Sequence, residues 1–375
     1  MIHKFLIAFY FLVFSTVCSA QETICDPSVA KNIKGKWMLG EDNIVSPDKT
    51  FPRSQYNQLN TRIDKIASLF QQAFPQPMGI EAKWYRSIRG SSIVNNGAVP
   101  YQFNSLYRGW YCNQNLHKVM LASETYIWAF VWVNTFGWFM TDQYGKTSLK
   151  IESTDTYMLP RKIGEWKGLP VYELSDKKNA KLVLITRDNQ LPFKPVSRLQ
   201  FLQTMKTRVE AEKKEQIDML KKQPGRTDAE EEVAKQKALA SYSKLTPGHE
   251  ASFLKNYKTA KQLKDESIER VENYYSERLK PIDDPLNTLS KVELQQPAIL
   301  DQNFVSFFKK FTTEEKGGRM MVFINNDYFN LKLPRYVPQL IVLYWSWDKT
   351  TSGMSLNNAI EENFQANKLK EMIDR

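Results

Sequence analysis

Residues 124–134 read ETYIWAFVWVN, and this stretch decides the fold. Its aromatic residues Tyr126, Trp128, Phe130 and Trp132 alternate with aliphatic ones. Because successive side chains of a strand point to opposite faces of a sheet, both faces of this strand are apolar. A strand that is apolar on both faces belongs in the middle of a sheet with cover on each side. The run is also too short to cross a bilayer as a helix, which needs roughly twenty apolar residues.

Further strands are predicted on both sides of this segment, since short β-branched and aromatic runs alternate there with turn residues such as Asn-Gly and Lys-Gly. The connections are too short for crossover helices, so the sheet should be mainly antiparallel. The predicted strands cover residues 32–40, 84–88, 106–112, 117–122, 124–134, 136–140, 148–152, 171–174 and 181–186.

A helix is predicted to precede this sheet and to pack on it. Ser54 is a candidate cap, Phe74-Pro75 ends the helix, and the apolar residues between them recur at helical spacing. These apolar residues are Leu59, Ile63, Ile66, Ala67 and Phe70.

A long, highly charged helical stretch follows the sheet. Ser197 to Gln200 and Thr227 to Glu230 both match the capping-box pattern that begins a helix. Thr246-Pro247 predicts the start of a third helix, with an apolar stripe toward Leu279. Basic and acidic residues are mixed along the stretch, which is typical of solvated helix faces and not of a nucleic-acid tract.

The C-terminal part returns to strands, predicted at residues 304–311, 319–324 and 339–347, and ends in a helix for which Ser355 is a candidate cap. The predicted class is therefore α+β, with mainly antiparallel sheet, a packed N-terminal helix, a long charged helical insertion or bridge, and a C-terminal β-rich unit ending in a helix. The predicted divisions are residues 1–20, 21–190, 191–285 and 286–375. The pattern does not choose between an insertion and a bridge.

Residues 1–20 read as a cleavable secretory signal. His3 and Lys4 give a positive start, Phe5 to Val17 are apolar, and Cys18-Ser19-Ala20 is a small-residue cleavage site. We expect a secreted or periplasmic protein with no transmembrane span after cleavage. An uncleaved anchor and a lipid-modified Cys18 are the weaker alternatives.

Removal of the signal leaves two cysteines, Cys25 and Cys112. In an oxidising compartment such a pair is most simply a disulfide. The alternative is two unpaired small apolar side chains.

The chain offers little catalytic chemistry. Only His117 and His249 remain after signal removal, and no H-E-x-x-H, Cys-x-x-Cys, calcium-loop, phosphate-loop or G-x-S-x-G motif is present. We therefore predict no catalytic residue, no metal ligand and no cofactor, and we favour a non-enzymatic protein. The formal net charge of +11 is spread along the chain, which suggests mild attraction to anionic surfaces.

Aromatic residues make up 13% of the chain and suggest a binding role, because their rings give large contact areas with few rotamers to freeze. Trp84, Arg86, Arg108 and Trp110 combine aromatic and guanidinium groups on two predicted strands and are the candidate ligand contacts. The hypothesis is an exported ligand-binding, polymer-binding or envelope-associated structural protein, whose partner is an envelope polymer or a protein. The alternatives are a carboxylate-based glycan hydrolase of the envelope and a scaffold that binds partners through its helices.

Peptide mapping of the exported protein without reductant tests the two predictions about its N-terminal part. We expect a mature chain that starts at Gln21 and a peptide pair joined through Cys25 and Cys112. A different mature start would contradict the signal assignment, and free thiols at both cysteines would contradict the bridge.

Overall fold

The computed structural model describes residues 25–45, 50–140, 146–174, 179–301 and 308–375, so the predicted signal lies outside the described residues. The fold is α+β with antiparallel-dominated sheets, as the sequence predicts. The chain divides into two compact units. Unit 1 comprises Met1–Phe136, Gly164–Asn189 and Asn330–Arg375, and unit 2 comprises Gly137–Ile163 and Gln190–Phe329. Within the described ranges, no helix has the length and apolar character needed to cross a membrane.

Unit 1 is built on a ten-stranded sheet with the order β1-β3-β4-β6-β15-β11-β10-β9, to which β2 adds beside β3 and β5 beside β4. β1 and β2 run parallel to β3, whereas the pairs β3–β4, β4–β6, β6–β15 and β15–β11 are antiparallel. The strands are β1 (Trp37–Leu39), β2 (Asn43–Val45), β3 (Ile80–Arg89), β4 (Tyr101–Asn113), β5 (Lys118–Leu121), β6 (Trp128–Val133), β9 (Lys162–Trp166), β10 (Leu169–Tyr172), β11 (Ala180–Thr186) and β15 (Leu340–Ser346).

β6 occupies the central position that its two apolar faces predict, because it pairs with β4 on one side and β15 on the other. The strand begins at Trp128, however, and not at Glu124. The Thr125 hydroxyl accepts a hydrogen bond from the Ile127 N–H at 3.0 Å, and this local turn bond replaces a ladder bond. Residues 124–127 therefore form a connection, and all four of them line a pocket.

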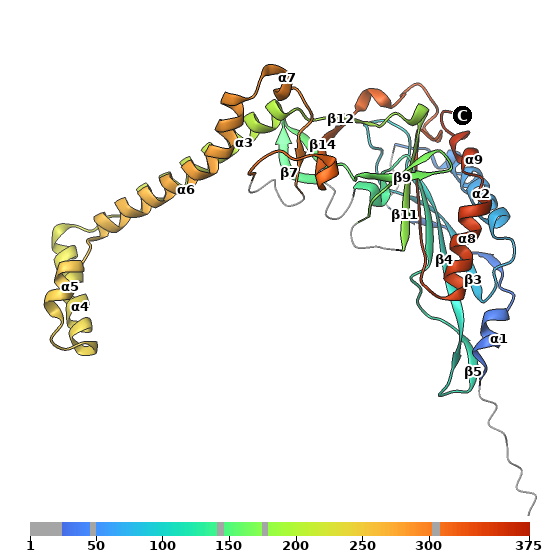
Figure 1. Cartoon of the computed structure of the whole chain (residues 1–375), viewed down its shortest axis with the longest axis horizontal. Helices are drawn as coiled ribbons and strands as arrows, with labels where there is room; N and C mark the ends of the chain where they lie inside the picture. Colours follow the sequence, from blue (N-terminus) through green and yellow to red (C-terminus); the bar gives the residue numbers. More distant parts are fainter. Residues whose placement is uncertain (1–24, 46–49, 141–145, 175–178, 302–307) are drawn as a thin grey trace, which may run out of the picture. The chain divides into compact units, whose positions relative to one another are not determined.

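Helices cover one face of this sheet (Figure 1). They are α2 (Tyr56–Ala73), α8 (Thr351–Asn363) and α9 (Ala366–Lys370). The predicted apolar face of α2 is buried, and Phe70 stacks on Phe103 of β4 and packs on Phe364, with ring centroids 4.8 Å and 4.7 Å apart.

The residues predicted to cap α2 and α8 are not the caps in the structure. Ser54 lies in a 3-10 turn before α2, and Thr350, not Ser355, caps α8 through a bond from the Gly353 N–H.

A disulfide joins Cys25 to Cys112, with Cα atoms 5.6 Å apart, as the cysteine count predicts. It ties α1 (Pro27–Asn32) to the end of β4. In the chain-entropy description, closing a loop of this length stabilises the folded state by about 4 to 5 kcal/mol.

Unit 2 contains a five-stranded sheet with the order β12-β14-β8-β7, in which β13 also pairs with β14. Two strand predictions fail in this unit. Residues 137–140 form a 3-10 turn that starts at Gly137, whose φ is +49°. Residues 304–307 of the predicted strand 304–311 lie outside the described residues, and residues 308–311 are not in a strand. The strands are β7 (Lys146–Ile151), β8 (Thr154–Met158), β12 (Phe193–Pro195), β13 (Ile299–Leu300) and β14 (Arg319–Ile324).

The charged stretch of unit 2 is helical, as predicted. Both predicted capping boxes form, at Ser197 and Thr227. The third predicted start is wrong, because Thr246 ends the preceding helix and the long return helix begins only after Thr259, in a capping box with Gln262. The helices are α3 (Arg198–Lys222), α4 (Asp228–Leu245), α5 (Glu250–Asn256), α6 (Ala260–Thr288) and α7 (Lys291–Leu294).

The base and the tip of this helical hairpin differ in burial. At the base, Phe201 of α3 and Tyr275 of α6 are buried in one apolar cluster with Leu149 of β7 and Met321 of β14. At the tip, α4 and α5 contain no buried residue. The base of the hairpin is therefore part of the core of unit 2, whereas the tip, which comprises α4 and α5, contributes nothing to that core.

Removing the tip should leave the core of unit 2 intact. The Lys264 ammonium donates to the carbonyls of Lys221 and Gln223 at 2.7 and 3.0 Å, so the cut ends of α3 and α6 lie side by side. Replacing residues 224–258 with a short Gly/Ser linker should shift the thermal midpoint by less than about 3 °C, since such surface changes cost little.

Deleting residues 198–280 is the contrasting variant, because it removes Phe201 and Tyr275 from the core. It should abolish cooperative unfolding of unit 2 in calorimetry. The division between base and tip would be contradicted if unit 2 stayed folded after the deletion of residues 198–280. It would also be contradicted if unit 2 unfolded after the replacement of residues 224–258.

Candidate functional site

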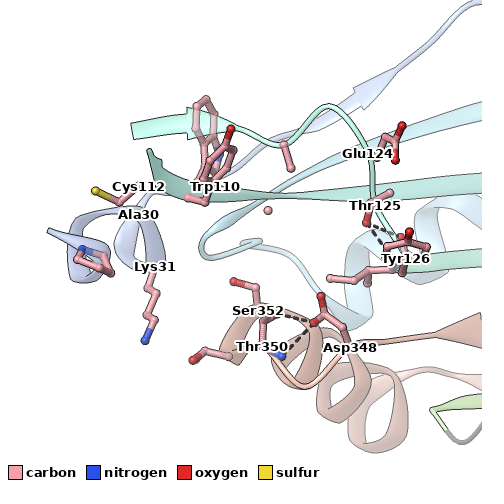
Figure 2. Close-up of a pocket in the computed structure, with 16 residues that line it drawn as sticks. Ala30, Lys31, Trp110, Cys112, Glu124, Thr125, Tyr126, Asp348, Thr350 and Ser352 are labelled. Carbon is pink, nitrogen blue, oxygen red and sulfur yellow. Dashed lines mark hydrogen bonds between the residues drawn. The ribbon is translucent and has the colours of Figure 1, made fainter. Parts of the chain in front are cut away.

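A pocket of about 470 Å³ lies in unit 1 where β4 leaves β6 and pairs with β5 (Figure 2). Four segments that are distant in the sequence form its walls. They are α1, the end of β4, the connection from β5 to β6, and the start of α8. The lining residues are Pro27, Ala30, Lys31, Gly109, Trp110, Tyr111, Cys112, Ala122, Glu124, Thr125, Tyr126, Ile127, Asp348, Thr350, Thr351 and Ser352.

The α1 wall is held in place by the disulfide and by the backbone around Gly79. Gly79 adopts a φ of +67°, and its N–H donates to Ile33 while its carbonyl accepts from Trp110. A Cβ at this position would lie 2.7 Å from the Ser352 hydroxyl and 3.0 Å from the Lys31 carbonyl. Only glycine therefore allows α1 and α8 to approach each other behind the pocket.

Two threonine side chains build the opposite wall and are occupied in doing so. The Thr125 hydroxyl donates to the Tyr107 carbonyl at 2.5 Å, which fixes the connection against β4. The Thr350 hydroxyl donates to Asp348 and accepts from the Gly353 N–H at 3.1 Å. These two hydroxyls thus position backbone and have little capacity left for a ligand.

Aromatic side chains supply most of the surface that a ligand can contact. The Tyr126 side chain is strongly exposed, at 76%, and Tyr111 is also exposed. The indole nitrogen of Trp110 is buried, and it has no hydrogen-bond partner among the described residues. A buried N–H without an acceptor is costly, so this indole nitrogen is an unusual feature of the pocket wall.

The charged groups of the pocket lie on different walls. Figure 2 draws Lys31 on the α1 side, Asp348 beside the start of α8, and Glu124 beyond Thr125 and Tyr126. Asp348 accepts hydrogen bonds from the Thr350 N–H at 3.1 Å and from the Thr350 hydroxyl. Asp348 is thus engaged in holding the start of α8.

Of the four candidate ligand contacts from the sequence, the structure places Trp110 in the pocket. Trp84 is buried on the helix-covered face, where Arg86 lies over its ring at 5.7 Å. Arg86 also pairs with Asp64 at 2.7 Å, and this hydrogen bond raises the pKa of the guanidinium. Arg108 pairs with Glu81 at 2.8 Å.

The strand register keeps Arg86 and Arg108 apart. Arg86 lies opposite Phe103, whereas Arg108 lies opposite Glu81. Since side chains alternate along β4, the odd-numbered position of Phe103 and the even-numbered position of Arg108 belong to opposite faces. The two arginines therefore do not share a site.

Lys31, Tyr126 and the start of α8 were not among the candidates from the sequence. They come together only through the fold, because α1, the β5–β6 connection and α8 are far apart along the chain. The one usable signal was Asp348-x-Thr350, which predicts a turn before a helix. Among the described residues, no group of three or more His, Cys, Asp or Glu side chains is placed to hold a metal ion.

Comparison with known proteins gives no relative from which a role can be transferred: no protein-family profile, no curated protein and no solved structure matches this chain.

Replacing Gly79 tests whether the close approach of α1 and α8 builds the pocket. Gly79→Ala should destabilise the protein by about 1 to 3 kcal/mol, because alanine is strained at this φ and its Cβ clashes with Ser352 and Lys31. Gly225→Ala is the control, since nothing lies within 4 Å of that position. Chemical denaturation measures both variants, and equal stabilities would contradict the role of Gly79.

Proposed function

We propose that the protein is an exported, non-enzymatic binding protein whose pocket holds a segment of an extracellular glycan. The observation that carries this proposal is the exposure of the Tyr111 and Tyr126 rings in a pocket that Trp110 also lines. Ligand sites typically combine a mainly apolar, aromatic lining with a few placed polar groups, and a pocket of this volume is within their usual range.

Glycan chemistry matches the groups that the pocket presents. Sugar hydroxyls can donate hydrogen bonds, so they suit the carboxylate acceptors of Glu124 and Asp348. Sugar rings also offer apolar faces that stack on aromatic side chains. The open side of the pocket lets a polymer chain continue beyond the bound segment.

Export is supported by two features. The first is the signal pattern of residues 1–20 in the sequence. The second is the Cys25–Cys112 bridge, because disulfides persist in oxidising compartments outside the cytosol. An extracellular glycan is accordingly a ligand that the protein would meet.

Hydrolysis of the glycan is the less favoured alternative. Glycosidases place two carboxyl groups about 5 to 10 Å apart on either side of the scissile bond. In this pocket Thr125 and Tyr126 lie between Glu124 and Asp348 (Figure 2), and Asp348 is engaged at the start of α8. The arrangement supports binding without cleavage.

Co-sedimentation with insoluble chitin, cellulose and peptidoglycan tests the proposal. The mature protein should pellet with at least one of these polymers, and Trp110→Ala and Tyr126→Ala should each weaken binding by about tenfold or more. Tyr274→Ala is the matched control, since Tyr274 is a 50% exposed tyrosine of α6 and should bind unchanged.

Two outcomes would contradict the proposal. One is the absence of binding to all three polymers, and the other is binding that Trp110→Ala and Tyr126→Ala leave intact. Release of reducing ends from the bound polymer, lost in Glu124→Gln, would instead support the hydrolase.

A further inference from the structure

The helix α4 packs on the rest of the tip with one face. Glu231 of this helix accepts hydrogen bonds from the Tyr257 hydroxyl at 2.7 Å and from the Ala260 N–H at 3.0 Å. Tyr242 lies about three turns further along the same face and packs on Phe253 of α5, with ring centroids 5.2 Å apart. The opposite face of α4 is accordingly turned away from these contacts.

This opposite face is exposed. Consecutive residues of an α-helix are about 100° apart, so Val233 and Ala240 lie about 180° to 200° around α4 from Glu231. Both side chains are exposed, and the exposed fraction of Val233 is 56%. We call this side of α4 the outer face, and its exposed residues are Ala229, Val233, Lys237, Ala240 and Lys244.

The charges of α4 are ordered along the helix. Its four acidic residues all lie between positions 228 and 232, and its three basic residues all lie between positions 235 and 244. Glu230 and Glu232 flank the outer face at its N-terminal end, while Lys237 and Lys244 lie on it toward the C-terminal end. Glu232, Lys237 and Lys244 form no ion pair with any residue in the described ranges.

A helix with this order of charge complements a second copy of itself that runs in the opposite direction. Val233 lies five residues after the first residue of α4, and Ala240 lies five residues before the last. When two α4 helices pair antiparallel about a two-fold axis, Val233 of each copy therefore lies against Ala240 of the other. The acidic end of each helix lies beside the basic end of its partner, and the antiparallel helix dipoles attract as well.

Partners of uniform charge fit the outer face less well. An anionic membrane surface would be repelled by Glu230 and Glu232 at the N-terminal end, and a cationic partner would be repelled by Lys237 and Lys244 at the other end. A reversed copy of α4 places opposite charges together at both ends. The pattern of charge thus favours a second copy of this chain.

We propose that two copies of the protein associate through the outer faces of their α4 helices, as an antiparallel dimer with two-fold symmetry. Each copy contributes one helix of 18 residues. Such a contact belongs to the small interfaces, below about 1,200 Å² of buried surface, which are weak and transient. We therefore expect a dissociation constant on the order of 10 µM. This dimer does not depend on the proposed function of the pocket.

Sedimentation velocity of the full mature chain, from about 1 to 200 µM, measures the dimer. The wild-type protein should show a reversible monomer–dimer equilibrium. Val233→Ser should weaken dimerisation about tenfold or more, because the symmetry removes the apolar contact twice. Val292→Ser is the matched control, since Val292 is a 76% exposed valine of α7 that lies outside the tip, and it should dimerise as the wild type does.

Two charge variants test the antiparallel order. The basic variant combines Glu230→Gln with Glu232→Lys, and the acidic variant combines Lys237→Glu with Lys244→Glu. Glutamine can keep the capping box with Thr227, and circular dichroism checks that both variants retain their helix content. Each variant alone should dimerise about tenfold or more weakly than the wild type. An equimolar mixture of the two should dimerise again, because acidic residues then meet basic ones.

Four results would overturn the proposal. The first is a wild-type protein that stays monomeric over the whole concentration range. The second is a dimer that persists when a Gly/Ser linker replaces residues 224–258, since its contact would lie outside the tip. The third is an equal effect of Val233→Ser and Val292→Ser. The fourth is a mixture of the two charge variants that stays monomeric, which would exclude the antiparallel pairing of charge.

Discussion

The antiparallel pairing of β6 with β15 is the interaction on which the rest of unit 1 depends. Residues 128–133 pair with residues 341–346, and β15 then continues the sheet to β11. The whole of unit 2 lies between these two strands in the sequence. Closing so long a loop costs entropy before any contact is made, so both strands must be strongly apolar to repay it. All seven residues of β15 are buried, which meets that requirement.

The same pairing sets up the candidate pocket. It places β15 and the following turn beside the β5–β6 connection, where the Ser346 hydroxyl donates to the Tyr126 carbonyl at 2.9 Å. The start of α8 consequently faces α1 across the pocket (Figure 2). On the sheet face opposite α2 and α8, the alternation of β6 places Phe130 and Trp132 next to Asn104 and Gln102. One strand therefore contributes to the sheet core and to the aromatic surface at the same time.

Local sequence patterns predicted much of the secondary structure correctly, but not its limits. The apolar face of α2 and the boxes at Ser197 and Thr227 depend on residues within a few positions of each other, and these predictions are confirmed. Predictions failed where two local signals compete. Ser355 has the right residue type for a cap, yet the cap is Thr350, which Asp348 supports through its side chain. Helix limits depend on such contacts and not on residue type alone.

The sequence by itself determined the class of the fold, the central place of β6 and the pairing of Cys25 with Cys112. Each of these follows from alternation, from helical spacing or from the number of cysteines, which are properties of the chain alone. Only the tertiary structure decided that Arg86 and Arg108 lie on opposite faces, that Trp110 lines a pocket, and that Ser87 and Gln102 are buried side by side. The physical reason is that strand register and long-range pairing bring distant residues together. A local sequence pattern indicates whether a side chain is buried, but it does not indicate which residue that side chain contacts.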